Sequence, residues 1–389
     1  MGSLKVFLIA ALFLIPNTAL AATCQEFDKA LETASRIRNL KILAPVNCKV
    51  VNKQKFTDLM HETYAENLSQ EKLDLEEIAS KMTGLIPQGY DYSRCYFVNN
   101  LESVVASYFP SHHSVFIPEG SETSFDLLVH EATHALQDQH FDLAKKSKST
   151  SHSTDSSFSF LALAEGDAEL VQSQYLKENS NQKRKSSEQY KQAPANSCEL
   201  PQSLLFQLDF PYFWGARYVS TLPNLDDTFS KYPRFTTQIL YPNKSFRYKQ
   251  PTSNESLKLV KSQFKKEQID PKPIYEDSWG EYTLRCLLRE LIGSRFSVIA
   301  GYGWLGDKIS MYKFKNKPQE HVLSWIFIMD QEKDVIELFK ALKLSLERRF
   351  NLKFNTDSNT ILFGNDTYSK ILLRHENNRV QFLVSDQKL

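Results

Sequence analysis

Two histidines four residues apart, with a glutamate directly after the first, are the residues of this chain best suited to chemistry. Residues 127–136 read LLVHEATHAL, which contains the pattern H-E-x-x-H at His130, Glu131 and His134. On a helix the two histidines lie one turn apart, about 40 degrees around the axis and about 6 Å along it, so both imidazoles can reach one zinc ion. Glu131 would then lie beside the open coordination position, where a carboxylate can act as general base on the attacking water. The pattern therefore predicts a zinc-dependent hydrolytic site.

Two residues compete for the place of third ligand. His140 has the spacing of the metzincin motif H-E-x-x-H-x-x-G-x-x-H, but Gln137 stands where that motif has its glycine. Without the glycine the helix continues, and His140 then points about 120 degrees away from His134 and lies about 9 Å further along the axis. Glu165 lies on a second predicted helix, and a glutamate from a second helix completes the His2Glu ligand set of gluzincins. We therefore expect His130, His134 and Glu165 to hold the metal.

The surroundings of Glu165 suggest how the two helices meet and what supports the ligands. Residues 162–169 read ALAEGDAE, and their small side chains would let this helix pack closely against the first. Asp167 or Glu169 could accept a hydrogen bond from a ligand histidine and so orient it, with Glu169, one turn beyond Glu165, the better placed. A solvent-facing acid is the alternative for either residue.

Two short β-prone runs precede the active-site helix, at residues 104–108 and 114–117, with a turn between them. In zinc peptidases an exposed edge strand pairs with the extended substrate, so either run is a candidate docking edge. His112 and His113 lie in the turn, where adjacent side chains point apart, and we expect them at the surface rather than on the metal.

A hydrolase of this type also needs a donor for the developing oxyanion. Tyr108, Tyr212 and Tyr218 have the right chemistry, although aromatic residues in such stretches also serve as core.

Hydrophobic periodicity and turn residues outline the elements that must hold these groups. The pattern predicts helices in much of 25–85, at 125–142, at 158–177, around 284–291 and at 335–346, a loop or lid at 145–157, a polar excursion at 177–196, and a terminal hairpin or small sheet from 360–363 and 370–383.

Composition limits the class of partner. The chain has 389 residues, of which 41% are hydrophobic and 24% charged, enough to bury a full core and to form about two modules. Lysine and arginine (47) nearly equal aspartate and glutamate (46), so the net charge is only +1. Such a chain has no overall positive field to hold nucleic acid or an anionic membrane. We expect a peptide or protein substrate recognised locally and no nucleic-acid partner, with the oligomeric state open.

The first residues have the order of a secretory signal peptide: Lys5, an apolar run at 6–15, and Ala-Leu-Ala at 19–21. No later run approaches the roughly 18 apolar residues that a membrane span needs. We therefore expect cleavage after Ala21 and a periplasmic or secreted protein without a transmembrane segment. Cys24 would permit a lipid anchor, but Thr23 stands where a lipoprotein signal has alanine, glycine or serine.

Five cysteines remain after the signal peptide, and export makes disulfides permissible. The simplest arrangement of five cysteines is two disulfide bridges and one free thiol. Cys24–Cys48 is a candidate pair, because it would link the mature N-terminus to the N-terminal segment. Several buried free thiols are the alternative.

Residues 130–143, HEATHALQDQHFDL, followed by AEGDA at 164–168, resemble a group of exported, mostly uncharacterised bacterial zincin-like proteins. The resemblance continues at 238–242, 279–281, 303–307 and 325–334, and it implies zinc on His130, His134 and Glu165 with Glu131 as base. Two positions depart from the group's pattern. Tyr241 stands where a histidine is expected, and residues 106–110 read ASYFP in place of a Gly-Tyr/Phe-Tyr-Asp-Pro run, which affects the shape of the substrate edge.

Together these features predict an α+β fold. We expect a signal peptide at 1–21, a helical N-terminal segment at 22–85, a zincin-like catalytic domain at 86–200, and a family-specific, mainly helical region at 201–389 that ends in a small β-hairpin. The expected function is that of a secreted zinc metallopeptidase. Two alternatives remain open: a catalytically silent zinc-binding envelope protein whose aromatic C-terminal half is its interface, and a zinc amidase acting on a non-protein amide.

Overall fold

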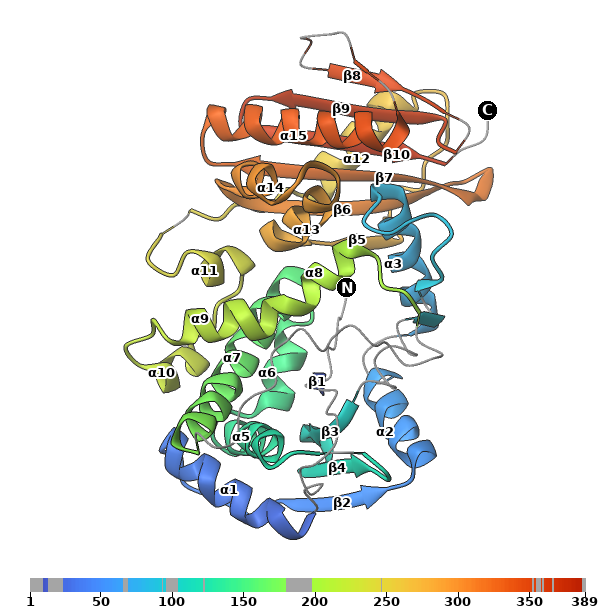
Figure 1. Cartoon of the computed structure of the whole chain (residues 1–389). Helices are drawn as coiled ribbons and strands as arrows, with labels where there is room; N and C mark the ends of the chain where they lie inside the picture. The colour runs from blue at the N-terminus through green and yellow to red at the C-terminus, as the bar shows by residue number, and fades with distance from the viewer. Residues whose placement is uncertain are drawn as a thin grey trace.

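A computed structural model of the chain describes most of its residues and has a mixed α+β fold, as expected (Figure 1). The described residues are 10–12, 24–65, 69–92, 94–95, 104–121, 123–179, 198–245, 247–351, 353–354, 358, 360–365 and 367–386. The expected signal-peptide cleavage site and nearly all of the polar excursion at 177–196 lie outside this part of the chain.

A four-stranded sheet and a long helix form the part of the molecule at the bottom of Figure 1. The strand order is β1-β3-β4-β2, with β1 at Ala10–Leu12, β2 at Asn47–Val51, β3 at Val104–Phe109 and β4 at Ser114–Pro118. Strand β2 is parallel to β4, and the other pairings are antiparallel. Both predicted strands are confirmed, whereas β2 falls in a segment that the sequence indicated as mostly helix.

Helix α5 (Phe125–Phe141) packs against this sheet and confirms the predicted active-site helix. Ala106 and Val115 of the sheet share one hydrophobic cluster with Leu128 and Ala132 of α5, and helix α1 (Cys24–Arg38) closes the same cluster. Apolar residues at helical spacing thus fix which face of α5 is buried against the strands.

Helix α7 (Thr154–Glu178) runs beside α5 and carries Glu165. Residues 145–157 are not the predicted loop or lid: they form most of helix α6 (Leu143–Thr150) and the first turn of α7. Ser153 caps α7 by accepting a hydrogen bond from the Ser156 N–H, and Thr154 and Asp155 are buried. The polar composition of this stretch therefore belongs to a partly exposed helix, α6, and to the capped and buried start of α7.

The C-terminal half is built on a six-stranded antiparallel sheet, which corrects the expectation of a mainly helical region ending in a small hairpin. Its strand order is β5-β6-β7-β10-β9-β8. The strands are β5 (Tyr275–Asp277), β6 (Trp304–Phe314), β7 (Lys317–Met329), β8 (Thr360–Phe363), β9 (Lys370–Glu376) and β10 (Arg379–Ser385). The predicted terminal strands are present, and the long hairpin β6–β7 is the part that the sequence did not reveal.

Both faces of this sheet are covered. Helices α13 (Gly280–Ile292), α14 (Ser294–Gly301) and α15 (Glu332–Phe350) lie over one face, and α12 (Ser253–Gln263) packs on the other (Figure 1). A strand covered on both faces reads as an apolar run without alternation, as residues 322–329 of β7 do, whereas polar residues such as Asp307 and Lys308 interrupt β6. The remaining helices are α2 (Lys53–Ala65), α3 (Gln70–Thr83), α8 (Gln202–Asp209), α9 (Gly215–Val219), α10 (Leu225–Ser230) and α11 (Thr236–Leu240), with a single turn of π-helix, η3 (Phe210–Trp214), between α8 and α9.

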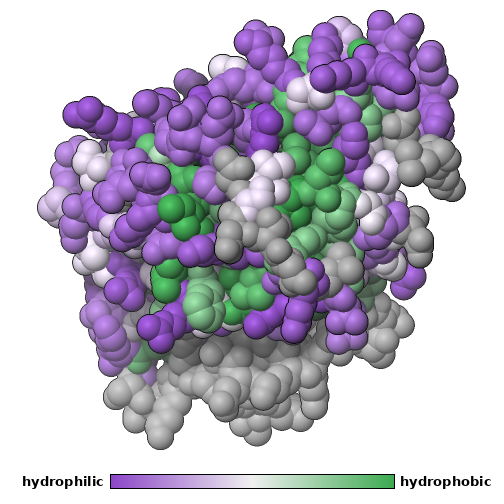
Figure 2. Space-filling model, turned by 90° about the horizontal axis from the view of Figure 1, so that it is seen from above, coloured by the Kyte–Doolittle hydropathy of each residue, from purple (hydrophilic) through white to green (hydrophobic). Residues whose placement is uncertain are grey.

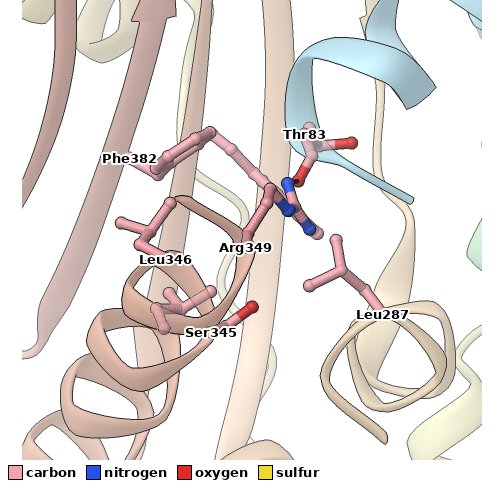
Figure 3. A pocket seen from close by; sticks show the side chains of 8 residues that line it. Thr83, Leu287, Ser345, Leu346, Arg349 and Phe382 are labelled. Carbon is pink, nitrogen blue, oxygen red and sulfur yellow. Dashed lines mark hydrogen bonds between the residues drawn. The ribbon is translucent and has the colours of Figure 1, made fainter. Parts of the chain in front are cut away.

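Helix α3 joins the N-terminal segment to the C-terminal sheet. The Arg349 guanidinium, from the end of α15, donates hydrogen bonds to the carbonyl oxygens of Thr83 (2.6 Å) and Gly84 (2.9 Å) at the end of α3 (Figure 3). The cavity beside Arg349 measures about 10 Å³ and is lined by Leu346 and Phe382 among others, so it is far too small for a substrate.

Hydrophilic residues cover most of the rim of the molecule seen from above, and hydrophobic residues lie at the surface between them (Figure 2). Strand β8 is the outermost strand of the large sheet, and its Leu362 is 57% exposed. Among the described residues no helix combines the length and the apolar character that crossing a bilayer requires.

Two disulfides link the cysteines, and one thiol remains. Cys24 is bonded to Cys48, as the sequence suggested, and Cys95 to Cys198, while Cys286 is free and buried. The first bridge fastens α1 to β2, and the second joins the segment before β3 to the start of α8.

Candidate metal centre

Helix α5 places His130 and His134 one turn apart on the face turned toward α7. Both imidazoles are completely buried, and their Nε2 atoms lie 3.1 Å apart. Glu165 of α7 is also buried, and its Oε2 lies 3.2 Å from the His130 Nε2 and 3.6 Å from the His134 Nε2. The three residues predicted as ligands therefore converge into one group that could hold a metal ion.

The donor set of this group fits a divalent cation. Two imidazole nitrogens and a carboxylate oxygen face one another, and these are the ligand types of zinc sites with an open position. The second oxygen of Glu165 and one oxygen of Glu131 are buried and have no hydrogen-bond partner among the described residues. Buried carboxylate oxygens without a donor are costly, and a cation between them would remove that cost.

The lowered pKa of Glu165 also fits a metal ligand. Burial alone would raise the pKa of this carboxyl, but the adjacent His134 and His130 outweigh burial and lower the pKa to about 2. Glu165 is therefore an anion, as a metal ligand must be.

Glu131 lies at the point where α5 meets the edge of the small sheet. Its Oε2 accepts a hydrogen bond of 2.7 Å from the backbone N–H of Tyr108 in β3. Burial raises the pKa of Glu131 to about 8, and the charge of Glu165 adds to this, while His130 and the Tyr108 N–H oppose it. A cation at the triad would favour the ionised form that a general base requires.

The side chains next to the ligand histidines are glutamines, which the sequence did not single out. The His134 Nδ1 lies 3.0 Å from Gln137 Oε1, and the His130 Nδ1 lies 3.2 Å from Gln172 Oε1. The expected orienting acids are thus not the direct partners of these nitrogens. Asp167 is the next residue in the hydrogen-bond network: its Oδ2 accepts a hydrogen bond of 3.0 Å from Gln137 Nε2.

Glu169, the other expected orienting acid, is buried on α7, but it is not the partner of either imidazole Nδ1. Sequence spacing could have indicated the two glutamines. Gln137 follows His134 by three residues, and Gln172 lies two helical turns beyond Glu165.

The predicted close approach of the small residues on α7 exists, but to a different helix. A β-carbon on Gly166 would meet the backbone carbonyl carbon of Gly215 at 2.2 Å, and one on Gly215 would meet the Ala162 carbonyl oxygen at 2.2 Å. The Gly-Ala face of α7 therefore packs on the start of α9, which leaves the Glu165 face free to meet α5.

His140, the rejected ligand, lies away from the triad. Its Nε2 lies 2.7 Å from the carbonyl oxygen of Lys41, as the uninterrupted helix predicted. His112 and His113 are exposed at the turn between β3 and β4, again as expected.

The tyrosines proposed as oxyanion donors have other surroundings. The Tyr108 hydroxyl donates a hydrogen bond of 2.8 Å to Asp138 Oδ2, which places Asp138 as an anchor between α5 and β3. Tyr218 is packed in a hydrophobic cluster with Phe158 and Phe210, and Tyr212 lies in η3.

The sheet order decides between the two candidate docking strands. Strand β4 lies between β3 and β2, so only β3 has an outer edge toward the metal centre. In the whole chain this edge is paired antiparallel with β1, with Ala10 opposite Ser107 and Leu12 opposite Val104. An extended segment therefore fits the outer edge of β3.

Comparison with known proteins adds no assignment. The sequence matches no family model and no curated protein, and the structure matches no solved structure. The arrangement of His130, His134, Glu165 and Glu131 is thus the basis for a functional conclusion.

Proposed function

We propose that this chain is an exported zinc-dependent peptidase with Glu131 as its general base. The single observation that carries the proposal is the buried convergence of His130, His134 and Glu165, with Glu131 next to the first ligand on the same helix. Structural zinc sites use four protein ligands, whereas three protein ligands and an adjacent carboxylate are typical of catalytic ones.

Zinc, when bound, would act as a Lewis acid toward water and toward the carbonyl oxygen of the substrate. Glu131 would take the proton of the attacking water and return it to the leaving amine. The Tyr108 N–H, 2.7 Å from Glu131 Oε2, holds one carboxylate oxygen in place and leaves the other to accept the proton.

The proposed substrate is an extended peptide bound along the outer edge of β3. Main-chain hydrogen bonds give such a pairing affinity without a charged surface, which agrees with the near-neutral composition of the chain. The antiparallel pairing of β1 supports this use of the edge. Because β1 occupies this edge in the full-length chain, removal of residues 1–21 would be the step that opens it to a substrate.

Export is supported by chemistry other than the signal-peptide pattern. Cys24–Cys48 and Cys95–Cys198 are disulfides that persist in oxidising compartments and are rare in the cytosol. These disulfides support the proposal of a periplasmic or extracellular location.

Metal analysis tests the ligand set. We expect one zinc per chain in the wild type and a loss of zinc in His134→Ala and Glu165→Ala. His140→Ala is the matched control, because it removes a histidine from the same helix whose ring bonds to a backbone carbonyl. Zinc lost from His140→Ala and kept by Glu165→Ala would overturn the assignment.

Hydrolysis tests the role of Glu131. A chain that begins at residue 22, loaded with zinc, should cleave members of an unbiased peptide library. Glu131→Gln should keep its zinc and lose at least about 100-fold in rate, as expected for removal of a general base. Equal rates in the two proteins would contradict the mechanism.

A silent zinc-binding protein is the second candidate, and one observation favours it: all four side chains of the centre are fully buried. Such a protein would keep zinc after residues 1–21 are removed but would cleave no amide substrate. Cleavage of a non-protein amide by the shortened chain, with no cleavage of peptides, would favour the amidase alternative.

A further inference from the structure

We propose that Gln137 and Gln172 are positioning residues of the metal centre. Each one fixes a ligand histidine in the tautomer that turns an unprotonated Nε2 toward Glu165, and each does so with a neutral amide. This inference rests on the triad as a metal site but not on hydrolytic activity.

The Gln137 amide has only one orientation that satisfies its neighbours. Its Nε2 lies 2.9 Å from the Ala164 carbonyl oxygen and 3.0 Å from Asp167 Oδ2. A backbone carbonyl can only accept, so the NH2 end of the amide faces Ala164 and the oxygen faces His134. The His134 Nδ1, 3.0 Å from that oxygen, must therefore carry the proton.

Gln172, on α7, fixes the same tautomer on His130. Its Nε2 donates a hydrogen bond of 2.7 Å to Asp126 Oδ2 in the first turn of α5. The oxygen of the amide then faces the His130 Nδ1 at 3.2 Å, which makes that nitrogen a donor as well.

The hydrogen bonds of Gln137 and Gln172 together determine which nitrogen of each ligand histidine faces the metal centre without a proton. With each Nδ1 protonated, the Nε2 atoms of His130 and His134 present lone pairs to each other at 3.1 Å and to Glu165 Oε2 at 3.2 and 3.6 Å. Three acceptors at these distances repel one another unless a proton or a metal cation lies between them. The two glutamines thus prepare the ligands for a cation before it binds.

The choice of amides rather than carboxylates balances the charge of the buried centre. Glu165 and Glu131 contribute two negative charges, which a divalent cation neutralises. A carboxylate in place of either glutamine would leave one uncompensated negative charge, which is costly in a buried site. The acid behind Gln137 does not alter this balance, because Asp167 is paired with Arg38 at 2.7 Å.

Zinc titrations of apolar variants test the inference. Gln137→Met and Gln172→Met keep the length of the side chain and remove its hydrogen bonds, and we expect each to weaken the zinc Kd by 10-fold to 100-fold. Gln139→Met on α5 and Gln174→Met on α7 are matched controls, since Gln139 bonds to residues 43 and 44 and Gln174 to Glu178. Their Kd values should equal that of the wild type.

A third variant separates positioning from simple structural support. Gln137→Glu keeps an acceptor for the His134 Nδ1 but adds a buried charge beside Asp167. We expect Gln137→Glu to bind zinc more tightly than Gln137→Met and yet to have the lower Tm of the two. A structural role alone would make affinity and Tm change together.

The tautomer is measurable without metal, which keeps this inference distinct from the proposed function. Proton–nitrogen NMR of histidine-labelled, metal-free protein should show an exchange-protected Nδ1–H on both His130 and His134, with protection lost for His134 in Gln137→Met. A wild type that binds no zinc would refute the metal site, and the NMR result would still decide the tautomers. Unprotected Nδ1 sites, or zinc Kd values of both methionine variants within twofold of the wild type, would overturn the inference.

Discussion

The backbone N–H of Tyr108 donates a hydrogen bond of 2.7 Å to Glu131 Oε2, so the small sheet and helix α5 meet at one carboxylate. Successive residues of a strand turn their backbone groups to opposite edges. The Val105 carbonyl accepts a hydrogen bond from Thr123, which follows β4, and the Tyr108 N–H therefore points to the other edge, along which β1 lies. Glu131 and the segment paired with β3 thus share one side of the sheet.

This relationship predicts that β1 covers the outer edge of β3 beside Glu131. A chain that begins at residue 22 lacks β1, and the outward backbone groups of β3, including those of Val104 and Ala106, should then exchange with solvent faster. Hydrogen exchange of the full-length and the shortened chain measures this directly. Amides of β9 and β10, which pair with each other in the large sheet, serve as internal controls and should not change. Equal protection of β3 in both chains would show that β1 does not cover the edge.

The sequence predicted the parts of this site that depend on local spacing. The H-E-x-x-H pattern and the missing glycine at position 137 sufficed to place His130 and His134 on one face of a helix and His140 off it. The inferences about the histidines held because they used the geometry of a single helix. Glu165 was chosen as an acid on a second helix, and it does meet the histidines, although the small residues beside it pack on α9 instead of α5.

The parts that escaped prediction depend on contacts between distant segments. Gln172 meets His130 across 42 residues. Its spacing from Glu165 places it on the ligand face of α7, but the pattern of α7 does not identify its partner on α5. The large sheet was missed in part because helices cover both of its faces, so residues 322–329 of β7 show an apolar run in place of alternation. The serine-rich stretch at 145–157 resembled a loop because serine is common in loops, whereas here the Ser149 and Ser151 hydroxyls donate to backbone carbonyls three residues earlier in the chain.

Gly166→Ala should disturb the ligand helix although it adds only one methyl group. The new β-carbon would meet the Gly215 carbonyl carbon at 2.2 Å, and backbone atoms cannot move aside as a flexible side chain can. Overpacking of this kind costs about 1–3 kcal/mol, and we expect a lower free energy of unfolding in urea together with a weaker zinc Kd. Gly89→Ala is the control, because no atom lies within 4 Å of its added carbon. A Gly166→Ala variant as stable as Gly89→Ala would contradict the close packing of α7 on α9.

Buried acids at the junction between α7 and the large sheet make stability depend on pH. Burial raises the pKa of Asp155 well above its usual value, and burial likewise raises the pKa of Glu281 and Asp307. A carboxyl with a raised folded-state pKa binds its proton more tightly in the folded protein. Its favourable contribution is complete below the unfolded pKa of about 4 and is lost as the pH rises through the folded pKa.

We therefore expect the free energy of unfolding to fall as the pH rises above about 4, by at most about 1.4 kcal/mol per pH unit for each proton released. Asp155→Asn should reduce this slope. The asparagine keeps the oxygen that accepts hydrogen bonds from the Thr236 backbone and hydroxyl, and it carries no charge. Urea unfolding between pH 4 and pH 9 measures the slope, with the exposed Asp270→Asn as control. An unchanged slope in Asp155→Asn would assign the pH dependence to other groups.

Arg349→Met should loosen the attachment of α3 to the C-terminal sheet. The guanidinium lies beside Thr83 at the end of α3 (Figure 3) and donates to the Thr83 and Gly84 carbonyls. A side chain at Gly84 would overlap it, so the cation and the helix end are in close contact. Burial lowers the pKa of Arg349. The hydrogen bonds to the two carbonyls therefore help to offset the cost of burying its charge. Methionine fills similar space but leaves both carbonyls without these donors, at a cost of about 3 kcal/mol.

The neighbouring Arg348→Met is the matched control, because that guanidinium is exposed and bonds only to the Leu291 carbonyl among its described contacts. Its removal should cost no more than about 0.5 kcal/mol. Hydrogen exchange would then localise the effect: amides of α3 should lose protection in Arg349→Met, while those of α5, which packs on the small sheet, should not. Equal losses in both helices would mean that Arg349 supports the whole fold rather than the junction of α3 with the large sheet.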